Sequence, residues 1–381
     1  MRRVEVVGGS VAGLSAAWEF LERGWGVRVW EDDRDPARFD ACGEAWTEPQ
    51  LCPLPKDPEH GFAGKLEGFM LHSWPAPGAH VTARLPAREA YISYRGQVQR
   101  SWAEMLAKRG AELRFGQRVR VADLDALQGE LVVDATGWPS LSAQRFGFLK
   151  EFRAPLLAFY ANVPLADARF PVGWLHAVVP SHFNPYSGYT WIFPRPDGIA
   201  NVGVGWDPLD PRAPPGHRAA LAATEELLDL DTTRWVGGNI PLWRGLDLAH
   251  ALHRLPSGVP VAAVGDAIGA VGPLTGDGMG PAMETARLLA DCALAGRLED
   301  YPAVLARHFA GRDRAHWRLR SYWDGVQDVR LFARVVQALD GLPFEALDRD
   351  PNAAARRLLR HPGLAVRMAM ARPMARGGWA R

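Results

Sequence analysis

A glycine-rich turn near the start of the sequence has the residue types and spacing needed to hold a dinucleotide. The stretch Gly8-Gly9-Ser10-Val11-Ala12-Gly13 nearly matches the pattern G-x-G-x-x-G, with Ser10 in place of the second glycine. Such a turn lets the backbone approach a pyrophosphate closely, and the N–H groups of the following helix point at the phosphates. Glu31 ends the next expected strand, where a carboxylate can accept hydrogen bonds from a ribose diol. We predict a dinucleotide site; the alternative is a plain strand–turn–helix without a ligand. The predicted contacts are Gly8, Ser10, Val11, Ala12, Gly13 and Glu31.

A second glycine-rich segment, far along the chain, could hold the flavin half of the same cofactor. Gly265-Asp266 closes an apolar run, and Pro273-Leu274-Thr275-Gly276-Asp277-Gly278-Met279-Gly280 follows. An aspartate at the end of a strand can bind a ribityl hydroxyl, and a turn into a helix offers N–H groups to a phosphate or a pyrimidine edge. The pairing of the two segments distinguishes a protein that binds FAD from one that binds only NAD. The predicted contacts here are Gly265, Asp266, Pro273, Thr275, Gly276, Gly278 and Met279.

Short buried strands are expected to position both segments. Residues 4–7 are a β-branched run before the first turn, residues 11–23 have a helical pattern, and residues 27–30 form a second β-branched run. This order predicts a β-α-β unit within about 30 residues. Residues 131–133 and 259–264 are further continuous apolar runs, typical of strands buried in a parallel sheet.

The remaining sequence predicts a second sheet and a helical tail. Residues 153–245 alternate apolar and polar side chains between turn signals, which is typical of antiparallel strands, and the pattern after Gly276 is helical. We therefore predict an α/β fold: a Rossmann-like FAD-binding domain, an inserted, mainly antiparallel substrate domain and a C-terminal helical segment. The expected boundaries are 1–60, 88–150 and 255–298 for the first, 61–87 and 151–254 for the second, and 299–381 for the third.

Composition excludes several other classes of protein. The chain has 381 residues with 48% apolar and 23% charged side chains, as in folded proteins, and its formal net charge of +1 argues against a nucleic-acid binder. Cys42, Cys52 and Cys292 provide neither a disulfide framework nor zinc spacing, and the histidines show no metal spacing, so we expect no metal and a reduced, cytoplasmic compartment. No apolar run reaches the roughly 18 residues of a membrane-spanning helix.

Four segments of the sequence resemble the geranylgeranyl reductase family of FAD-dependent oxidoreductases, within the p-hydroxybenzoate-hydroxylase-like superfamily. They are residues 6–17 with Glu31; Cys42-Gly43-Glu44; Tyr189-Thr190-Trp191-Ile192-Phe193-Pro194 with Gly198, Asn201, Val202, Gly203 and Gly205; and residues 265–284. The third is similar to the family's Y-x-W-x-F-P…G-x-x-N-V-G-x-G signature, and the fourth to its G-D-A…P-L-T-G-(D/E)-G pattern. Weaker similarities are residues 91–95 and 134–137. Ser10, residues 45–85 and the tail after about residue 300 depart from the family pattern.

The resemblance implies a reductase that uses reduced FAD to saturate isolated C=C bonds of a polyprenyl chain, or a relative with a changed substrate. It implies further cofactor contacts by Cys42, Gly43, Arg95, Thr136 and Gly137. Because the sequence shows no separate NAD(P)H domain, NAD(P)H or another reductant must bind transiently.

Alkene reduction needs hydride on one carbon, a proton on the other, and a dry slot for the substrate. Cys42, Glu44 and Tyr189 are candidates for supplying or relaying the proton; the alternatives are a buried inert thiol, a solvated carboxylate and an ordinary strand tyrosine. Trp191 belongs to the same catalytic set. The slot could be lined by Trp46, Trp174, Phe159, Trp191 and Phe193, each of which could equally be core.

The C-terminal segment is basic. After Asp350 there is no acidic residue, and the seven arginines are Arg356, Arg357, Arg360, Arg367, Arg372, Arg376 and Arg381. Such an end could lie on an anionic membrane surface, which would suit a lipid substrate; the alternative is a solvated helix face packed on the body of the protein.

Two other functions remain open at this point. A monooxygenase or halogenase of the same fold would bring reduced flavin to oxygen, and halogenases carry a W-x-W-x-I-P element that residues 189–194 partly match. They also need a lysine, for which Lys56 and Lys65 are candidates, whereas hydroxylases commonly place a histidine where this chain has Ile268-Gly269-Ala270. A non-catalytic FAD-binding protein is the third possibility.

Overall fold

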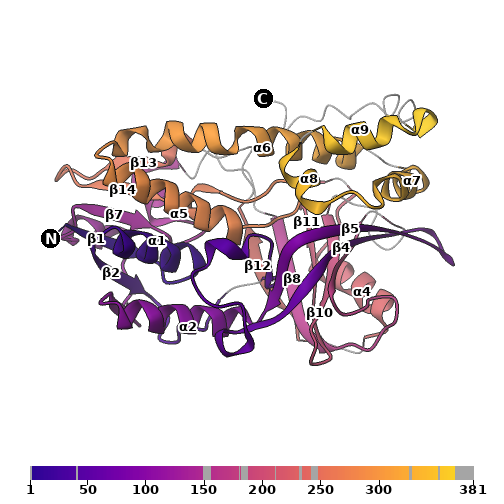
Figure 1. The fold of residues 1–381 in the computed structure, drawn as a ribbon, viewed down its shortest axis with the longest axis horizontal. Helices are drawn as coiled ribbons and strands as arrows, with labels where there is room; N and C mark the ends of the chain where they lie inside the picture. The colour runs from indigo at the N-terminus through magenta and orange to yellow at the C-terminus, as the bar shows by residue number, and fades with distance from the viewer. Residues whose placement is uncertain are drawn as a thin grey trace.

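Two β-sheets and a group of C-terminal helices form the part of the chain that the structure describes. The computed structural model describes residues 2–39, 42–148, 156–179, 181, 188–210, 212–230, 234–241, 248–325, 328–350 and 352–364. The first sheet lies at the N-terminal side of the molecule, and the second sheet lies beside it (Figure 1).

The first sheet is parallel except for one edge strand. Its strands, in spatial order, are β13 (Leu252–Arg254), β14 (Pro260–Ala263), β7 (Leu131–Asp134), β1 (Arg3–Val7), β2 (Gly26–Glu31) and β6 (Glu112–Phe115). β1 pairs with β2 and β7 in parallel, with Val4 opposite both Val27 and Leu131. The β-branched runs of the sequence become these central strands because both of their faces are buried.

Helices cover this sheet. They are α1 (Val11–Glu22), α2 (Arg95–Lys108), α3 (Leu141–Phe146) and α5 (Met279–Leu294), together with the short 3-10 turns η3 (Val121–Ala126), η5 (Leu248–His250), η6 (Gly265–Ile268) and η7 (Leu298–Asp300). α1 lies against α5, and both contribute to one core with Val4, Leu14 and Ala286 fully buried. The small residues of α1 permit this close packing, so the first turn and the start of α5 come together.

The second sheet is mainly antiparallel. Its strands, in spatial order, are β12 (Val236–Ile240), β8 (Leu156–Pro164), β11 (Ile199–Trp206), β10 (Gly188–Pro194), β9 (Trp174–Val178), β4 (Phe62–Ala76), β5 (Ala79–Ser93) and β3 (Ala45–Trp46). β4 and β9 form its parallel pair. Outside the strands lie α4 (His217–Leu228) and the turns η1 (Pro49–Leu51) and η2 (Pro58–His60).

The C-terminal helices join the two sheets. They are α6 (Tyr301–Gly325), α7 (Val329–Leu339), α8 (Phe344–Arg349) and α9 (Ala353–Leu359). α6 runs across the top of the view in Figure 1, and α7, α8 and α9 lie over the second sheet. One side of α7 is apolar, and it packs with β4 and β5 in a core that includes Leu85, Phe332 and Val336.

The α/β fold class predicted from the sequence is confirmed. Both sheets extend past the expected domain boundaries: β3 and the end of β5 belong to the second sheet, and β13 belongs to the first. In the described residues no helix is long and apolar enough to cross a membrane. Arg356 is ion-paired with Asp350, whereas Arg367 and the arginines after it lie outside the described residues.

Candidate functional site

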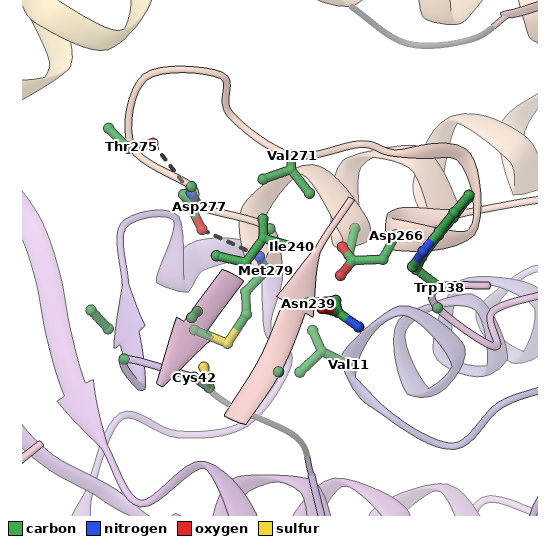
Figure 2. A pocket seen from close by; sticks show the side chains of 18 of the residues that line it. Val11, Cys42, Trp138, Asn239, Ile240, Asp266, Val271, Thr275, Asp277 and Met279 are labelled. Atoms are coloured by element: carbon green, nitrogen blue, oxygen red, sulfur yellow. Dashed lines mark hydrogen bonds between the residues drawn. The ribbon is translucent and has the colours of Figure 1, made fainter. Parts of the chain in front are cut away.

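One large cavity lies between the two sheets and continues under the C-terminal helices. Its volume is about 1680 Å³, and it is lined by the first glycine turn, the Cys42 loop, η6, the turn before α5 and helices α6 to α9. Figure 2 shows Cys42, Asp266 and Met279 reaching it from three separate segments. The cavity therefore brings together residues that are far apart in the sequence.

The first glycine turn is as tight as its sequence requires. Gly8 has a φ of +107°, and a Cβ there would lie 2.3 Å from the backbone oxygen of Ala135. A Cβ at Gly13 would lie 1.8 Å from the oxygen of Gly8, so only glycine lets α1 pack this close to β1. Gly13 itself does not line the cavity, but Gly8, Ser10, Val11 and Ala12 do.

Ser10 and Arg95 form one polar unit at the start of α1. The Arg95 guanidinium donates to the Ser10 hydroxyl at 2.6 Å and to the Gln99 side-chain oxygen at 2.9 Å. Ser10 in turn donates to Gln99 at 3.4 Å. The serine that departs from the glycine pattern thus holds a cation at the helix N-terminus, where an anionic pyrophosphate would bind.

Glu31 and the turn after β7 shape the other end of this region. The Glu31 carboxylate accepts hydrogen bonds from the backbone N–H of Gly9 at 2.5 Å and of Asp33 at 2.9 Å. Asp134 is 1% exposed and accepts from the Thr136 hydroxyl at 2.6 Å, which fixes the turn at Thr136 and Gly137. Glu31, Thr136 and Gly137, for which we predict contacts with the cofactor, all line the cavity.

Asp266 presents a carboxylate to the cavity. Burial raises its pKa to about 6; Arg95 lowers this pKa and Asp277 raises it further. Among the described residues, no group donates a hydrogen bond to this carboxylate. A half-buried carboxylate without a donor fits a ribityl hydroxyl, which would supply that hydrogen bond.

The turn before α5 is held from three directions. Thr47 donates to the Asp277 carboxylate at 2.6 Å, Arg320 of α6 donates to the Pro273 carbonyl at 2.9 Å, and the Tyr189 hydroxyl donates to the Thr275 carbonyl. Thr275, Gly276, Gly278 and Met279 line the cavity, whereas Pro273 and Gly265 do not. Burial raises the pKa of Tyr189 above its ordinary value, so its hydroxyl stays protonated.

The Cys42–Glu44 loop is fixed to the Tyr189–Pro194 strand by Asn201. The Asn201 amide donates to the Cys42 carbonyl at 2.8 Å and to the Glu44 carboxylate at 3.0 Å, while its oxygen accepts from the Trp191 indole at 2.8 Å. A Cβ at Gly203 would lie 2.0 Å from the Trp191 ring, and one at Gly43 would lie 2.7 Å from the Phe193 ring. These contacts explain why Asn201 and Gly203 accompany Trp191 in the motif, and why Gly43 follows Cys42.

Glu44 is engaged on every side. It is 3% exposed, has a φ of +60°, and forms a buried ion pair with Arg195. The backbone N–H of Arg95 donates to the other carboxylate oxygen at 2.8 Å. These partners suit a group that holds the loop in place better than one that moves protons, although Glu44 does line the cavity.

The aromatic residues predicted to line the substrate slot divide into two groups. Trp191 and Phe193 line the cavity. The other three, Trp46, Trp174 and Phe159, do not, which corrects their assignment. Trp46 is 1% exposed and donates to Ser93 within the core, Arg84 lies against the Trp174 ring, and Phe159 stacks on Trp206.

An apolar extension of the cavity was missed by the sequence analysis. We call it the apolar arm; its lining is Phe69, Leu71, Leu85 and Ala177 from the second sheet, with Leu274, Leu319, Phe332, Val335, Val336, Leu339, Phe344, Leu347, Asn352, Ala354, Ala355, Leu358 and Leu359. The apolar periodicity of residues 329–339 was the available signal, but the same periodicity also describes a helix that packs on a solid core.

The residues of the cavity fit FAD. The turn at Gly8 lets a phosphate approach the backbone closely, and Arg95 supplies a cation beside it. Asp266 has a carboxylate that can accept a hydrogen bond from the ligand. With the two-sheet fold, these features define an FAD-dependent oxidoreductase.

Comparison with known proteins finds a relative that matches most of the chain. No family model matches the chain. Over 363 residues it is 25% identical to digeranylgeranylglycerophospholipid reductase 1 of Methanopyrus kandleri, which covers 88% of this chain and 91% of that protein. This similarity agrees with the resemblance of the four motif segments to the geranylgeranyl reductase family.

Solved structures confirm the fold. A geranylgeranyl bacteriochlorophyll reductase-like protein of Thermoplasma acidophilum superposes with a TM-score of 0.77 at 16% identity, covering 97% of this chain and all of that one. A halogenase, PltM, solved in complex with FAD, superposes with a TM-score of 0.64 at 15% identity, covering 98% of this chain and 86% of that one. The fold is thus shared between reductases and halogenases, and the distinction must come from the site.

The lysines considered for a halogenase are elsewhere. Neither Lys56 nor Lys65 lines the cavity. Lys56 donates to the Cys52 and Leu54 carbonyls and lies over the Phe62 ring. Neither lysine is therefore placed to act on a ligand in this cavity.

Proposed function

We propose that the protein is an FAD-dependent reductase that saturates C=C bonds in the polyprenyl chain of a lipid. One observation carries this proposal: the same cavity that is lined by the residues predicted to contact the flavin continues into the apolar arm. No described residue that lines the arm is charged. A long hydrocarbon chain suits such a lining because it has no polar groups that must be removed from water on binding.

Reduced FAD, when bound, supplies the hydride for one carbon of the double bond. The chain's own residues must hold the alkene and provide a proton for the other carbon. Trp191 and Phe193 line the cavity and belong to one apolar cluster, which Phe69 of the arm also contacts, so they provide an apolar wall for the alkene.

Cys42 is the proton donor that we favour. Its side chain is half-buried and lines the cavity, and its sulfur accepts from the Glu44 backbone N–H at 3.2 Å. Glu44, Arg195 and Asn201 hold this loop in position. Tyr189 is the second candidate, but its proton already bonds to the Thr275 carbonyl, so we assign it to orienting the turn before α5.

The reductant and the membrane contact belong to the same proposal. The described strands form two sheets, and both already contribute to the one cavity, so NAD(P)H or another reductant would bind transiently. The basic residues after Asp350 would bring the protein to the surface of an anionic membrane that holds the lipid. Flotation with anionic liposomes tests this contact, and unchanged flotation after truncation at Asp350 would refute it.

Product analysis under anaerobic conditions tests the function. Reduced, FAD-loaded enzyme is mixed with a geranylgeranyl lipid, and the product is analysed by mass spectrometry. The proposal predicts a product that gains two hydrogens for each bond reduced, without oxygen, and a much lower yield from Cys42→Ala. A product that forms only when oxygen is admitted would instead assign a monooxygenase or halogenase.

A further inference from the structure

Two phenylalanine rings meet inside the cavity. Phe69 of β4 and Phe344 of α8 stack with ring centroids 3.8 Å apart and an angle of 15° between their planes. Both residues line the cavity, and both are only partly buried. The pair therefore links the second sheet to the C-terminal helices through a contact that a bound ligand would also touch.

Phe69 stands where the flavin end of the cavity meets the apolar arm. On one side it packs with the apolar cluster that contains Leu175, Trp191 and Phe193. On the other side it packs with the cluster of the arm, which contains Leu85 and Phe332. A chain that runs from Trp191 toward the arm would therefore lie against the stacked rings.

The backbone around Phe344 is tied to β5 independently of the stack. The Gly341 N–H donates to the Arg84 carbonyl at 2.8 Å, and the Arg84 N–H donates to the Asp340 carboxylate at 2.8 Å. The Arg88 N–H donates to the Glu345 carboxylate at 2.6 Å. Because these bonds flank Phe344 on both sides, removal of its ring should leave open space instead of a collapsed helix.

We propose that the Phe69–Phe344 pair determines how far a polyprenyl chain enters the arm, and therefore which of its double bonds is reduced. The inference rests on the proposed function. Every isoprene unit of such a chain carries a double bond, so a change in depth presents a different bond to the same hydride and proton donors. Each reduction still adds one hydride and one proton to one C=C bond while the reduced cofactor is oxidised, so only the position changes.

The test compares chain-length preference without turnover. Oxidised, FAD-loaded protein is titrated with geraniol, farnesol and geranylgeraniol, and binding is followed by tryptophan fluorescence. Phe344→Ala should shift the preference toward the longer alcohol by roughly tenfold relative to the unmodified protein. Phe344→Leu, a milder change, should shift it in the same direction, and Leu294→Ala, at an exposed position that does not line the cavity, should leave it unchanged.

Product analysis then locates the reduced bond. With reduced enzyme, Phe344→Ala should move the saturated position along the chain, whereas Leu294→Ala should not. One outcome is that the unmodified protein binds and reduces prenyl chains while both Phe344 variants keep the same length preference and the same product. That result would overturn the role of the pair but not the proposed function. If the unmodified protein neither binds nor reduces any of these chains, the proposed function fails and the role of the pair fails with it.

Discussion

Asn201 donates a hydrogen bond to the Cys42 carbonyl at 2.8 Å, across the junction between a loop and a strand that are far apart in the sequence. The same side chain accepts from the Trp191 indole at 2.8 Å. One amide therefore sets the position of the proposed proton donor relative to an aromatic wall of the cavity. The two motifs of the sequence that contain these residues act as a single unit.

Removal of this amide should disturb the loop and the strand together. Asn201→Ala leaves the buried Trp191 N–H unpaired, and we expect a loss of about 1–3 kcal/mol in the free energy of unfolding. Turnover should fall roughly tenfold or more because the Cys42 loop loses its anchor. Asn162→Ala is the matched control, since Asn162 is exposed and contacts Arg195 but not the loop. Equal effects of the two substitutions on turnover would contradict the assignment.

The buried pair of Glu44 and Arg195 gives a second prediction. Both side chains are almost fully buried, so Glu44→Ala leaves a buried cation without its counter-ion. We expect destabilisation of about 3–5 kcal/mol, measured by urea unfolding. The double variant Glu44→Gln with Arg195→Met should recover much of that loss. If it is no more stable than Glu44→Ala, the ion pair does not account for the effect.

The raised pKa of Asp266 predicts a pH dependence of cofactor binding. A ribityl hydroxyl donates more strongly to the ionised carboxylate than to the neutral acid. Because the pKa of Asp266 is about 6 before the cofactor binds, affinity for FAD should decrease as the pH falls through that value. Quenching of flavin fluorescence at a series of pH values measures this, and Asp266→Asn should bind more weakly with a flatter profile. An unaltered profile in that variant would rule out Asp266 as its source.

Two buried histidines predict a loss of stability in acid. His72 and His176 hydrogen-bond to each other at 3.0 Å on the sheet face opposite the apolar arm. Burial lowers the pKa of His72 to about 2 and that of His176 to about 4. The unfolded chain therefore binds more protons than the folded chain below about pH 6.5. As the pH falls, each histidine then lowers the free energy of unfolding by up to about 1.4 kcal/mol per pH unit.

The corresponding measurement is urea unfolding of the protein at pH 7 and pH 5. His72→Gln should lower the free energy of unfolding at both pH values, because the hydrogen bonds of His72 are lost. The difference in this free energy between pH 7 and pH 5 should be smaller than in the unmodified protein. His361→Gln, at an exposed position, should keep the original difference. A difference of the same size in all three proteins would assign the acid sensitivity to other groups.

The tight turn at the expected cofactor end of the site was predictable because its geometry is local. Gly8, Ser10 and Gly13 need a tight turn between a strand and a helix, and that requirement is written in consecutive residues. Trp46 was assigned wrongly because a residue type does not reveal which side of a sheet it faces; its indole donates to Ser93 in the core. The apolar arm was missed for a related reason, since Phe332 and Val336 have the spacing of any buried helix face. The role of Asn201 could not be predicted from its place in a motif, because its contacts with Cys42 and Trp191 depend on how the strand and the loop meet in the fold.

The central claim is that one cavity serves both the flavin and a prenyl chain. Anaerobic stopped-flow absorbance tests it most directly: reduced, FAD-loaded enzyme is mixed with a geranylgeranyl lipid, and reoxidation of the flavin is followed. The account predicts reoxidation at a rate that rises with lipid concentration and saturates, with one flavin oxidised for each double bond reduced. It also predicts no such reaction with the fully saturated lipid. Flavin that stays reduced in the presence of lipid, and reoxidises only when oxygen is admitted, would contradict the account.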